Sequence, residues 1–80
     1  MPTVLRIGPY FFRFYAADID EPPHVHVVRD RAQAKFWLEP QVRLEWQRGF
    51  RRHELNLLQR LIEEHRAFLL EKWHEHFRRG

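Results

Sequence analysis

The spacing of the apolar residues changes near Gly49, and this change limits the possible folds more than any other feature of the chain. Before Gly49, apolar and aromatic residues occur in short runs or alternate with polar ones, which is the period of a β-strand. After Gly49, they recur at steps of three and four, which is the period of an amphipathic helix. The sequence therefore predicts an α+β protein, with strands within residues 3–46 and a helix over about residues 52–78.

The helical half contains no proline, and no glycine between Gly49 and the last residue. We therefore expect one long helix, with a bend near His65 as the alternative. Its N-terminal cap is weak, because Arg51-Arg52-His53 offers no Ser, Thr, Asp or Asn. The apolar stripe of the helix is Leu55, Leu58, Ile62, Phe68 or Leu69, Trp73 and Phe77.

The first half of the chain predicts an antiparallel meander of four to five strands. The expected strands are 4–7, 10–15, 24–29, 32–38 and a shorter fifth at 41–46. Gly8-Pro9 and Asp30-Arg31 are turn signals, and a loop covers residues 17–23. These short connections favour antiparallel pairing of neighbouring strands. Because 80 residues are too few for a second core, we expect a single domain over residues 1–80, with the helix on one face of the sheet.

Alternation along the strands sorts their side chains into two faces, and a register error of one residue would exchange them. The face expected to pack against the helix is Leu5, Ile7, Tyr10, Phe12, Phe14, Val25, Val27, Ala34, Phe36, Leu38, Val42 and Leu44. The opposite face is Arg6, Phe11, Arg13, Tyr15, His24, His26, Gln33, Lys35, Trp37, Arg43 and Glu45.

The opposite face combines large aromatic side chains with cations, and one helix cannot cover both faces of a sheet. Such a surface can stack bases and contact phosphates, as in sheet-based RNA-binding proteins. It equally fits a protein interface, where aromatics and arginine are enriched. A third interpretation is that loops or the far end of the helix cover the aromatics. The predicted binding residues are Arg6, Phe11, Arg13, Tyr15, Trp37 and Arg43, for RNA or a protein partner.

His24 and His26 lie two residues apart on a strand, so both imidazoles project from one face. They could act as general base and general acid in phosphodiester cleavage, with Lys35 stabilising the charged phosphate. They could instead hold a metal, with Glu21 or an aspartate of the preceding loop, Asp18 or Asp20, as an added ligand. The third possibility is a hydrogen-bonding pair that orders the loop. The sequence does not require any cofactor.

Charge and composition narrow the class of protein. The net charge of +3 lies entirely in residues 41–80, which fits a nucleic acid or an acidic protein partner. The absence of cysteine excludes disulfides and thiolate zinc sites. No run approaches the length of a membrane span and no signal segment opens the chain, so we expect a cytoplasmic protein without a membrane partner. A short chain of this kind is also a candidate homodimer.

Four segments of the sequence resemble one bacterial family, called domain of unknown function 4160. They are Met1 to Ile7, the segment Glu21-Pro22-Pro23-His24-Val25-His26-Val27, the strand Ala34-Lys35-Phe36-Trp37-Leu38, and the ending with Trp73 and Phe77. They occur in the order and at the spacing of that family, over essentially the whole chain.

The resemblance implies a limited set of functions. Genes of this family often lie beside genes of the domain-of-unknown-function 2442 family, and the pair resembles a toxin–antitoxin module. The present chain would then be the toxin, a possible endoribonuclease, and its partner an antitoxin-like protein. His24, His26 and Lys35 match the motifs of the family, and Arg6 matches its opening motif. Their catalytic roles follow from the face argument alone.

Overall fold

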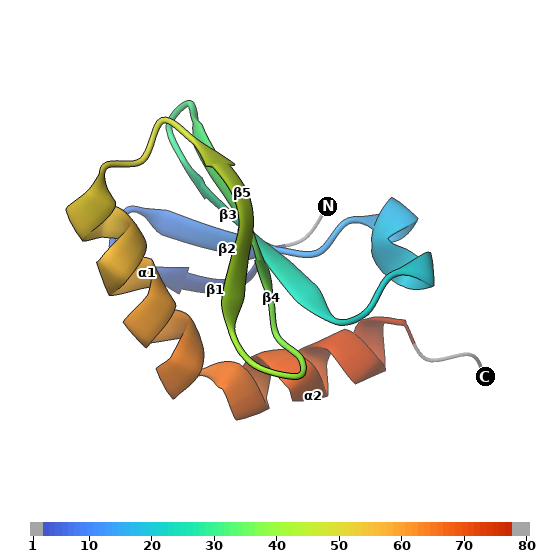
Figure 1. Cartoon of the computed structure of the whole chain (residues 1–80). Helices are drawn as coiled ribbons and strands as arrows, with labels where there is room; N and C mark the ends of the chain where they lie inside the picture. Colours follow the sequence, from blue (N-terminus) through green and yellow to red (C-terminus); the bar gives the residue numbers. More distant parts are fainter. Residues whose placement is uncertain (1–2, 78–80) are drawn as a thin grey trace.

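The computed structural model describes residues 3–77, apart from the side chain of Asp18. Its five strands are β1 (Thr3–Ile7), β2 (Tyr10–Arg13), β3 (His24–Arg29), β4 (Ala32–Trp37) and β5 (Arg43–Arg48), followed by α1 (Arg52–Glu64) and α2 (Arg66–His76). The strands form one antiparallel sheet in the order β1-β2-β3-β4-β5 (Figure 1). The predicted α+β class and the meander are therefore confirmed. The loop expected between β2 and β3 contains a 3-10 helix, η1 (Ala16–Asp20).

Two residues with positive φ close the predicted hairpins. Gly8 has φ 56° between β1 and β2, and Asp30 has φ 54° between β3 and β4. Gly49, which joins β5 to α1, has φ 88°, and a Cβ at this position would lie 3.0 Å from the Cα of Ala32. Glycine is therefore required at position 49 both by backbone conformation and by close packing.

The core lies between the sheet and the two helices, and it contains most of the side chains that alternation assigns to it. Leu5 and Ile7 are only partly buried, because β1 is an edge strand. Leu44 is 36% exposed, so its assignment to the core is wrong. It lies on β5, the other edge of the sheet. The buried members are Tyr10, Phe12, Phe14, Val25, Val27, Ala34, Phe36, Leu38 and Val42 from the first half of the chain, and Phe50, Leu58, Ile62, Leu69 and Trp73 from the second.

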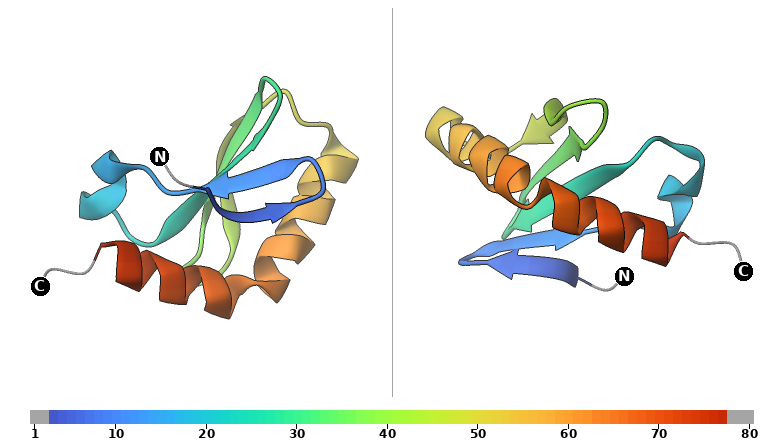
Figure 2. Two further views of the ribbon diagram at one scale, coloured as in Figure 1. Left: turned by 180° about the vertical axis from the view of Figure 1, so that it is seen from behind. Right: turned by 90° about the horizontal axis from the view of Figure 1, so that it is seen from below.

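The prediction of one long helix is wrong, and the alternative of a bend near His65 is confirmed. His65 leaves the helical region with φ −104° and ψ 15°. Its ring Nδ1–H donates to the carbonyl of Leu61 at 2.8 Å, the same oxygen that accepts the His65 backbone N–H at 3.0 Å. Arg66 then donates from Nε to the carbonyl of Leu38 at 2.6 Å. The bend lets α1 follow one side of the twisted sheet and α2 cross its end (Figure 2).

A buried carboxylate joins the start of α1 to the sheet. Glu54, 8% exposed, accepts hydrogen bonds from the Tyr10 hydroxyl at 3.1 Å and from Arg29 Nε and Nη2 at 2.7 and 3.0 Å. It also accepts the backbone N–H of Arg51 at 3.1 Å, so the helix start, expected to be weakly capped, is capped by its own third residue. The backbone N–H of Arg51 and the guanidinium of Arg29 lower the pKa of Glu54 below its ordinary value.

Replacing this carboxylate should alter the response of the protein to acid. Because the pKa of Glu54 is lower in the folded chain, the ionised form stabilises the fold above about pH 4.5, and this stability is lost as the pH falls through the folded pKa. Glu54→Gln is therefore expected to lower the melting temperature by several degrees at neutral pH and to flatten its decline in acid. Thermal unfolding followed by circular dichroism at a series of pH values measures both effects. Glu64→Gln, at an exposed position of the same helix, is the control. Parallel acid profiles of Glu54→Gln and the wild type would contradict the prediction.

Candidate functional site

The side of the sheet opposite the main core carries three rows of side chains that cross the strands, and α2 reaches only the His24 end of the third row. We call this side the open face. Directly paired residues of antiparallel strands share a face, so the register defines each row. The rows are Arg6, Phe11, Val28, Gln33 and Arg48; then Arg13, His26, Lys35 and Trp46; then His24, Trp37 and Arg43.

The middle row brings the chemistry of the open face together. Arg13 pairs with His26, His26 with Lys35, and Lys35 with Trp46, across β2 to β5. A cation, an imidazole, a second cation and an indole thus lie side by side. Trp46, 41% exposed, was not among the expected binding residues.

A register shift explains why Trp46 was missed. Lys35 pairs with Trp46, whereas the next residue, Phe36, pairs with Leu44, so Glu45 is an extra residue in β5. Alternation without this bulge would place Trp46 on the same face as Leu44. No turn residue or proline in the strand signals the bulge.

The two histidines differ in their surroundings. The His24 side chain is fully buried, at 0% exposure, so the expectation that it lies on an uncovered face is wrong. Its ring packs against Trp37 at 5.4 Å and against Trp73 of α2 at 5.1 Å, so the far end of the helical segment covers it. Its Nδ1–H donates to the carbonyl of Pro22 at 2.9 Å, which ties the proline loop to the strand.

His26 lies at the boundary between this buried ring and the open face, and it is partly exposed. Its ring contacts the ring of His24 at 5.1 Å, Tyr15 at 4.6 Å and Trp46 at 6.2 Å. A group that exchanges a proton with a substrate must reach it. Of the two predicted catalytic imidazoles, only that of His26 is partly exposed, and its Nε2 atom is buried.

Lys35 is held in place from two sides. Its Nζ donates to Glu21 Oε1 at 2.5 Å and lies 4.6 Å from the ring centre of Trp37. The indole N–H of Trp37 donates in turn to Glu45 Oε1 at 2.8 Å. The expected neighbours His26, Lys35 and Trp37 are therefore brought together, with the carboxylates of Glu21 and Glu45 beside them.

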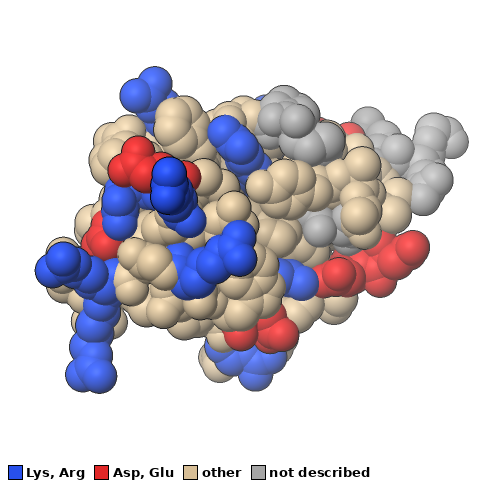
Figure 3. Space-filling view, turned by 90° about the horizontal axis from the view of Figure 1, so that it is seen from above, with Lys and Arg blue, Asp and Glu red and all other residues tan. Residues whose placement is uncertain are grey.

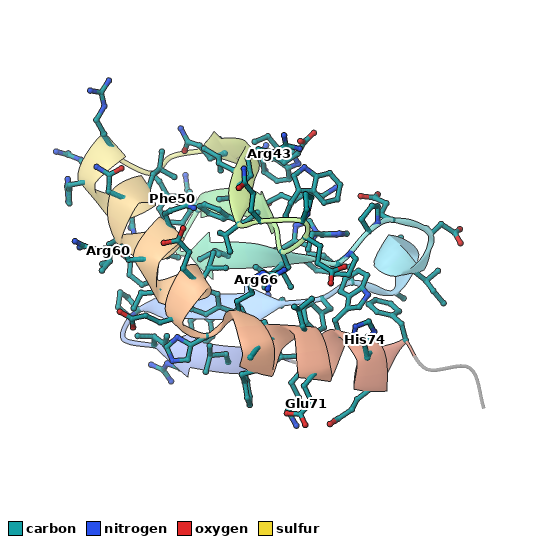
Figure 4. All side chains as sticks on the ribbon, turned by 60° about the horizontal axis from the view of Figure 1, so that its bottom comes forward. Arg43, Phe50, Arg60, Arg66, Glu71 and His74 are labelled. Atoms are coloured by element: carbon teal, nitrogen blue, oxygen red, sulfur yellow. The ribbon has the colours of Figure 1, made fainter. Side chains whose placement is uncertain are left out.

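A second group of predicted binding residues lies near the β1 edge. The guanidinium carbons of Arg6 and Arg13 lie 4.9 and 5.5 Å from the ring centre of Phe11. Arg6 is paired with Phe11 on the neighbouring strand, and Arg13 lies two residues further along the same strand. Arg6 is exposed and Phe11 is partly exposed. Arginines stacked on an aromatic ring can present their outer N–H groups to an anion, although the Nε of Arg13 is itself buried. At the other edge, Arg43 is exposed on β5 (Figure 4).

A space-filling view from the side away from α2 shows how charge is distributed over that side of the molecule (Figure 3). Lys and Arg side chains are spread over the surface and separated by uncharged groups, with smaller acidic clusters between them. The surface is thus mixed but rich in cations, in agreement with the net charge of the chain.

The described side chains include no group of three or more His, Asp or Glu residues close enough to hold a metal ion. His24 Nδ1 lies 3.9 Å from Glu21 Oε1, but it donates its proton to Pro22. Asp18 was considered as an added metal ligand, but its side chain is not among those that the structure describes. Metal binding by His24, His26 and Glu21 stays a prediction.

The fold and this surface define a small α+β protein with a basic, aromatic sheet face. The sequence model of the family described as Domain of unknown function (DUF4160) matches residues 10–74, so the chain belongs to that family. The match covers the histidine segment, α1, most of α2 and the open face from β2 to β5. Comparison with curated proteins and with solved structures gave no significant match. Within residues 3–77, neither helix is long and apolar enough to cross a membrane.

Proposed function

We propose that this protein is a small bacterial toxin-like module that acts in the cytoplasm and binds single-stranded RNA through its open face. The observation that carries the proposal is the middle row, in which the register aligns Arg13, His26, Lys35 and Trp46 across the sheet. Single-stranded RNA offers bases that can stack on exposed aromatic rings and a backbone that attracts cations.

The distribution of aromatics and cations over the open face supports this choice of ligand. Trp46 presents an exposed ring near the β5 edge, and Phe11 presents a ring between two arginines near the β1 edge. The exposed guanidinium groups of Arg6, Arg43 and Arg48 surround these rings and can contact phosphates. A strand of RNA crossing the sheet would meet stacking and charge contacts in alternation.

Cleavage of the bound RNA is a second candidate, favoured by the contact between the imidazoles of His24 and His26. Once RNA binding exposes the Nε2 of His26, which is buried in the free protein, this ring would accept the proton of a 2′-hydroxyl as its oxygen attacks the neighbouring phosphorus. Lys35 would stabilise the added negative charge, and the departing 5′ oxygen would take a proton from water. In this scheme buried His24 supports the ring of His26 and does not touch the RNA.

The proposal also includes a biological setting, which rests on the resemblance of the sequence motifs. The motifs that this chain shares with its family imply the toxin component of a toxin–antitoxin pair. Its partner would then be an antitoxin-like protein whose binding prevents the open face from binding RNA.

Trp46→Ala tests the stacking role of the open face. Loss of one stacked base costs about 1–3 kcal/mol, so we expect binding of a fluorescent single-stranded RNA to weaken roughly tenfold or more. Fluorescence anisotropy measures the affinity, and a denaturing gel of the same mixtures shows whether the RNA is cut.

Phe68→Ala provides a matched control. Phe68 is 38% exposed, close to the exposure of Trp46, but it lies on α2 beside Lys72. This variant is expected to bind RNA as the wild type does. If both variants lose affinity equally, or if the wild type does not bind RNA at low salt, the open face is not an RNA site.

A further inference from the structure

Strand β5 leaves one edge of the sheet open. It stands at the end of the strand order, and no other strand within residues 3–77 pairs with its outer side. Five of its six residues are exposed. In Figure 1 this strand lies nearest the viewer, with neither helix in front of it. An edge strand presents a row of backbone N–H and C=O groups that can pair with another chain.

The side chains of β5 give this edge two apolar anchors. Among the described residues, the exposed large hydrophobics are Leu44, Trp46 and Phe68, and Leu44 and Trp46 belong to β5. Because of the bulge at Glu45, Leu44 lies on the helix side of the sheet and Trp46 on the open face. A strand added at this edge would therefore find an apolar neighbour on each face, the arrangement that gives strand addition its side-chain specificity.

The charges of β5 identify the kind of strand that fits. Arg43 and Arg48 are exposed at its two ends, whereas the carboxylate of Glu45 accepts the indole N–H of Trp37. In the register that pairs all six residues with a second copy, Arg43 of each chain would face Arg48 of the other. Like charges directly opposite one another destabilise a strand pair. The edge therefore favours an acidic strand over a second copy of this chain.

We propose that β5 is a docking edge on which an acidic, extended segment of a partner protein adds as a further strand. Its backbone pairs with the outer side of β5, its carboxylates meet Arg43 and Arg48, and its apolar residues pack on Leu44 and Trp46. This interaction uses the edge of the sheet, and it does not require RNA to bind the open face.

A titration with a synthetic peptide tests the docking edge. The probe is a peptide of about ten residues with valines on one face and, on the other, two glutamates that flank a valine, so that carboxylates meet Arg43 and Arg48 and apolar side chains meet Leu44 and Trp46. Amide signals in the nuclear magnetic resonance spectrum of the 15N-labelled protein should shift for β5 and its neighbour β4. A peptide with lysine in place of glutamate should bind at least tenfold more weakly. A peptide N-methylated at alternate amides, which cannot pair along one edge, should lose binding.

Reversing the charge of selected arginines distinguishes docking of the peptide on β5 from general attraction between the acidic peptide and a basic protein. Arg43→Glu/Arg48→Glu should weaken binding of the acidic peptide at least tenfold. Arg52→Glu/Arg60→Glu changes the net charge equally at exposed positions of α1 and should leave the affinity unchanged (Figure 4). Absence of β5 shifts at millimolar peptide, equal binding of the N-methylated peptide, or equal effects of both double variants would overturn the proposal. Concentration-dependent dimerisation of the wild type that Leu44→Asp abolishes would also overturn it, in favour of a second copy.

Discussion

Phe12→Ala is expected to lower the free energy of unfolding by about 3–5 kcal/mol. Phe12 is fully buried in the centre of the core, between β2 and the helices. Removing a buried phenyl ring costs about 3–5 kcal/mol, because the lost burial is added to the cavity left behind. A chain of 80 residues has a free energy of unfolding of only about 4–12 kcal/mol. The substitution should therefore remove a large part of the stability.

Phe11, the residue next to Phe12, provides a closely matched control. Phe11 carries the same side chain on the same strand, but it lies on the open face and is partly exposed. Its loss removes the contacts with Arg6 and Arg13, which are worth about 0.5–1 kcal/mol each at exposed sites. Urea unfolding followed by circular dichroism should show a much larger fall in midpoint for Phe12→Ala than for Phe11→Ala. Equal destabilisation would mean that the two faces of β2 are wrongly assigned.

Removal of the two arginines on Phe11 is expected to reduce RNA binding by about 100-fold or more. Hydrogen bonds to charged groups contribute about 1.5–3 kcal/mol each, and two such contacts together exceed the energy of a hundredfold change in affinity. Arg6→Ala/Arg13→Ala should also lower the slope of log affinity against log salt by about 1.4, since each phosphate contact with a single strand contributes about 0.7. Anisotropy titrations between about 50 and 200 mM salt measure both quantities.

Two arginines of α1 serve as the comparison for this experiment. Arg52→Ala/Arg60→Ala removes the same charge from exposed positions of the helix, away from the open face. It should reduce affinity only slightly and leave the salt slope nearly unchanged. If the two double variants lose affinity and slope to the same extent, the RNA responds to the net charge of the protein and not to the open face.

The two proposals make separable predictions for the same strand. Leu44→Asp changes the helix side of β5 and should impair peptide docking while RNA binding persists. Arg6→Ala/Arg13→Ala changes β1 and β2, at the other end of the strand order from β5, and should impair RNA binding while peptide docking persists. Each variant thus controls for misfolding in the assay of the other. Failure of one proposal leaves the other open to test.

Local sequence patterns account for most of the fold. The hairpin turns at Gly8 and Asp30 depend on a few neighbouring residues, and period-two alternation placed Phe12, Val25, Val27 and Phe36 in the core. The candidate site was also partly predictable, because His26, Lys35 and Trp37 follow from alternation along two paired strands. The sequence by itself therefore determined the element types, the strand order and most of each face.

Contacts between distant segments decided the rest. The bulge at Glu45, which turns Trp46 to the open face, exists only where β5 pairs with β4. The burial of His24 depends on Trp73, nearly fifty residues away in the chain. At the bend, His65 makes a local hydrogen bond to the carbonyl of Leu61. The direction that α2 takes after the bend is held by the hydrogen bond from Arg66 to the carbonyl of Leu38. Periodicity records which side of its own element a residue faces, but not what another element will bring against that side. Only the packing of α2 across the end of the sheet buried His24 and left His26 partly exposed.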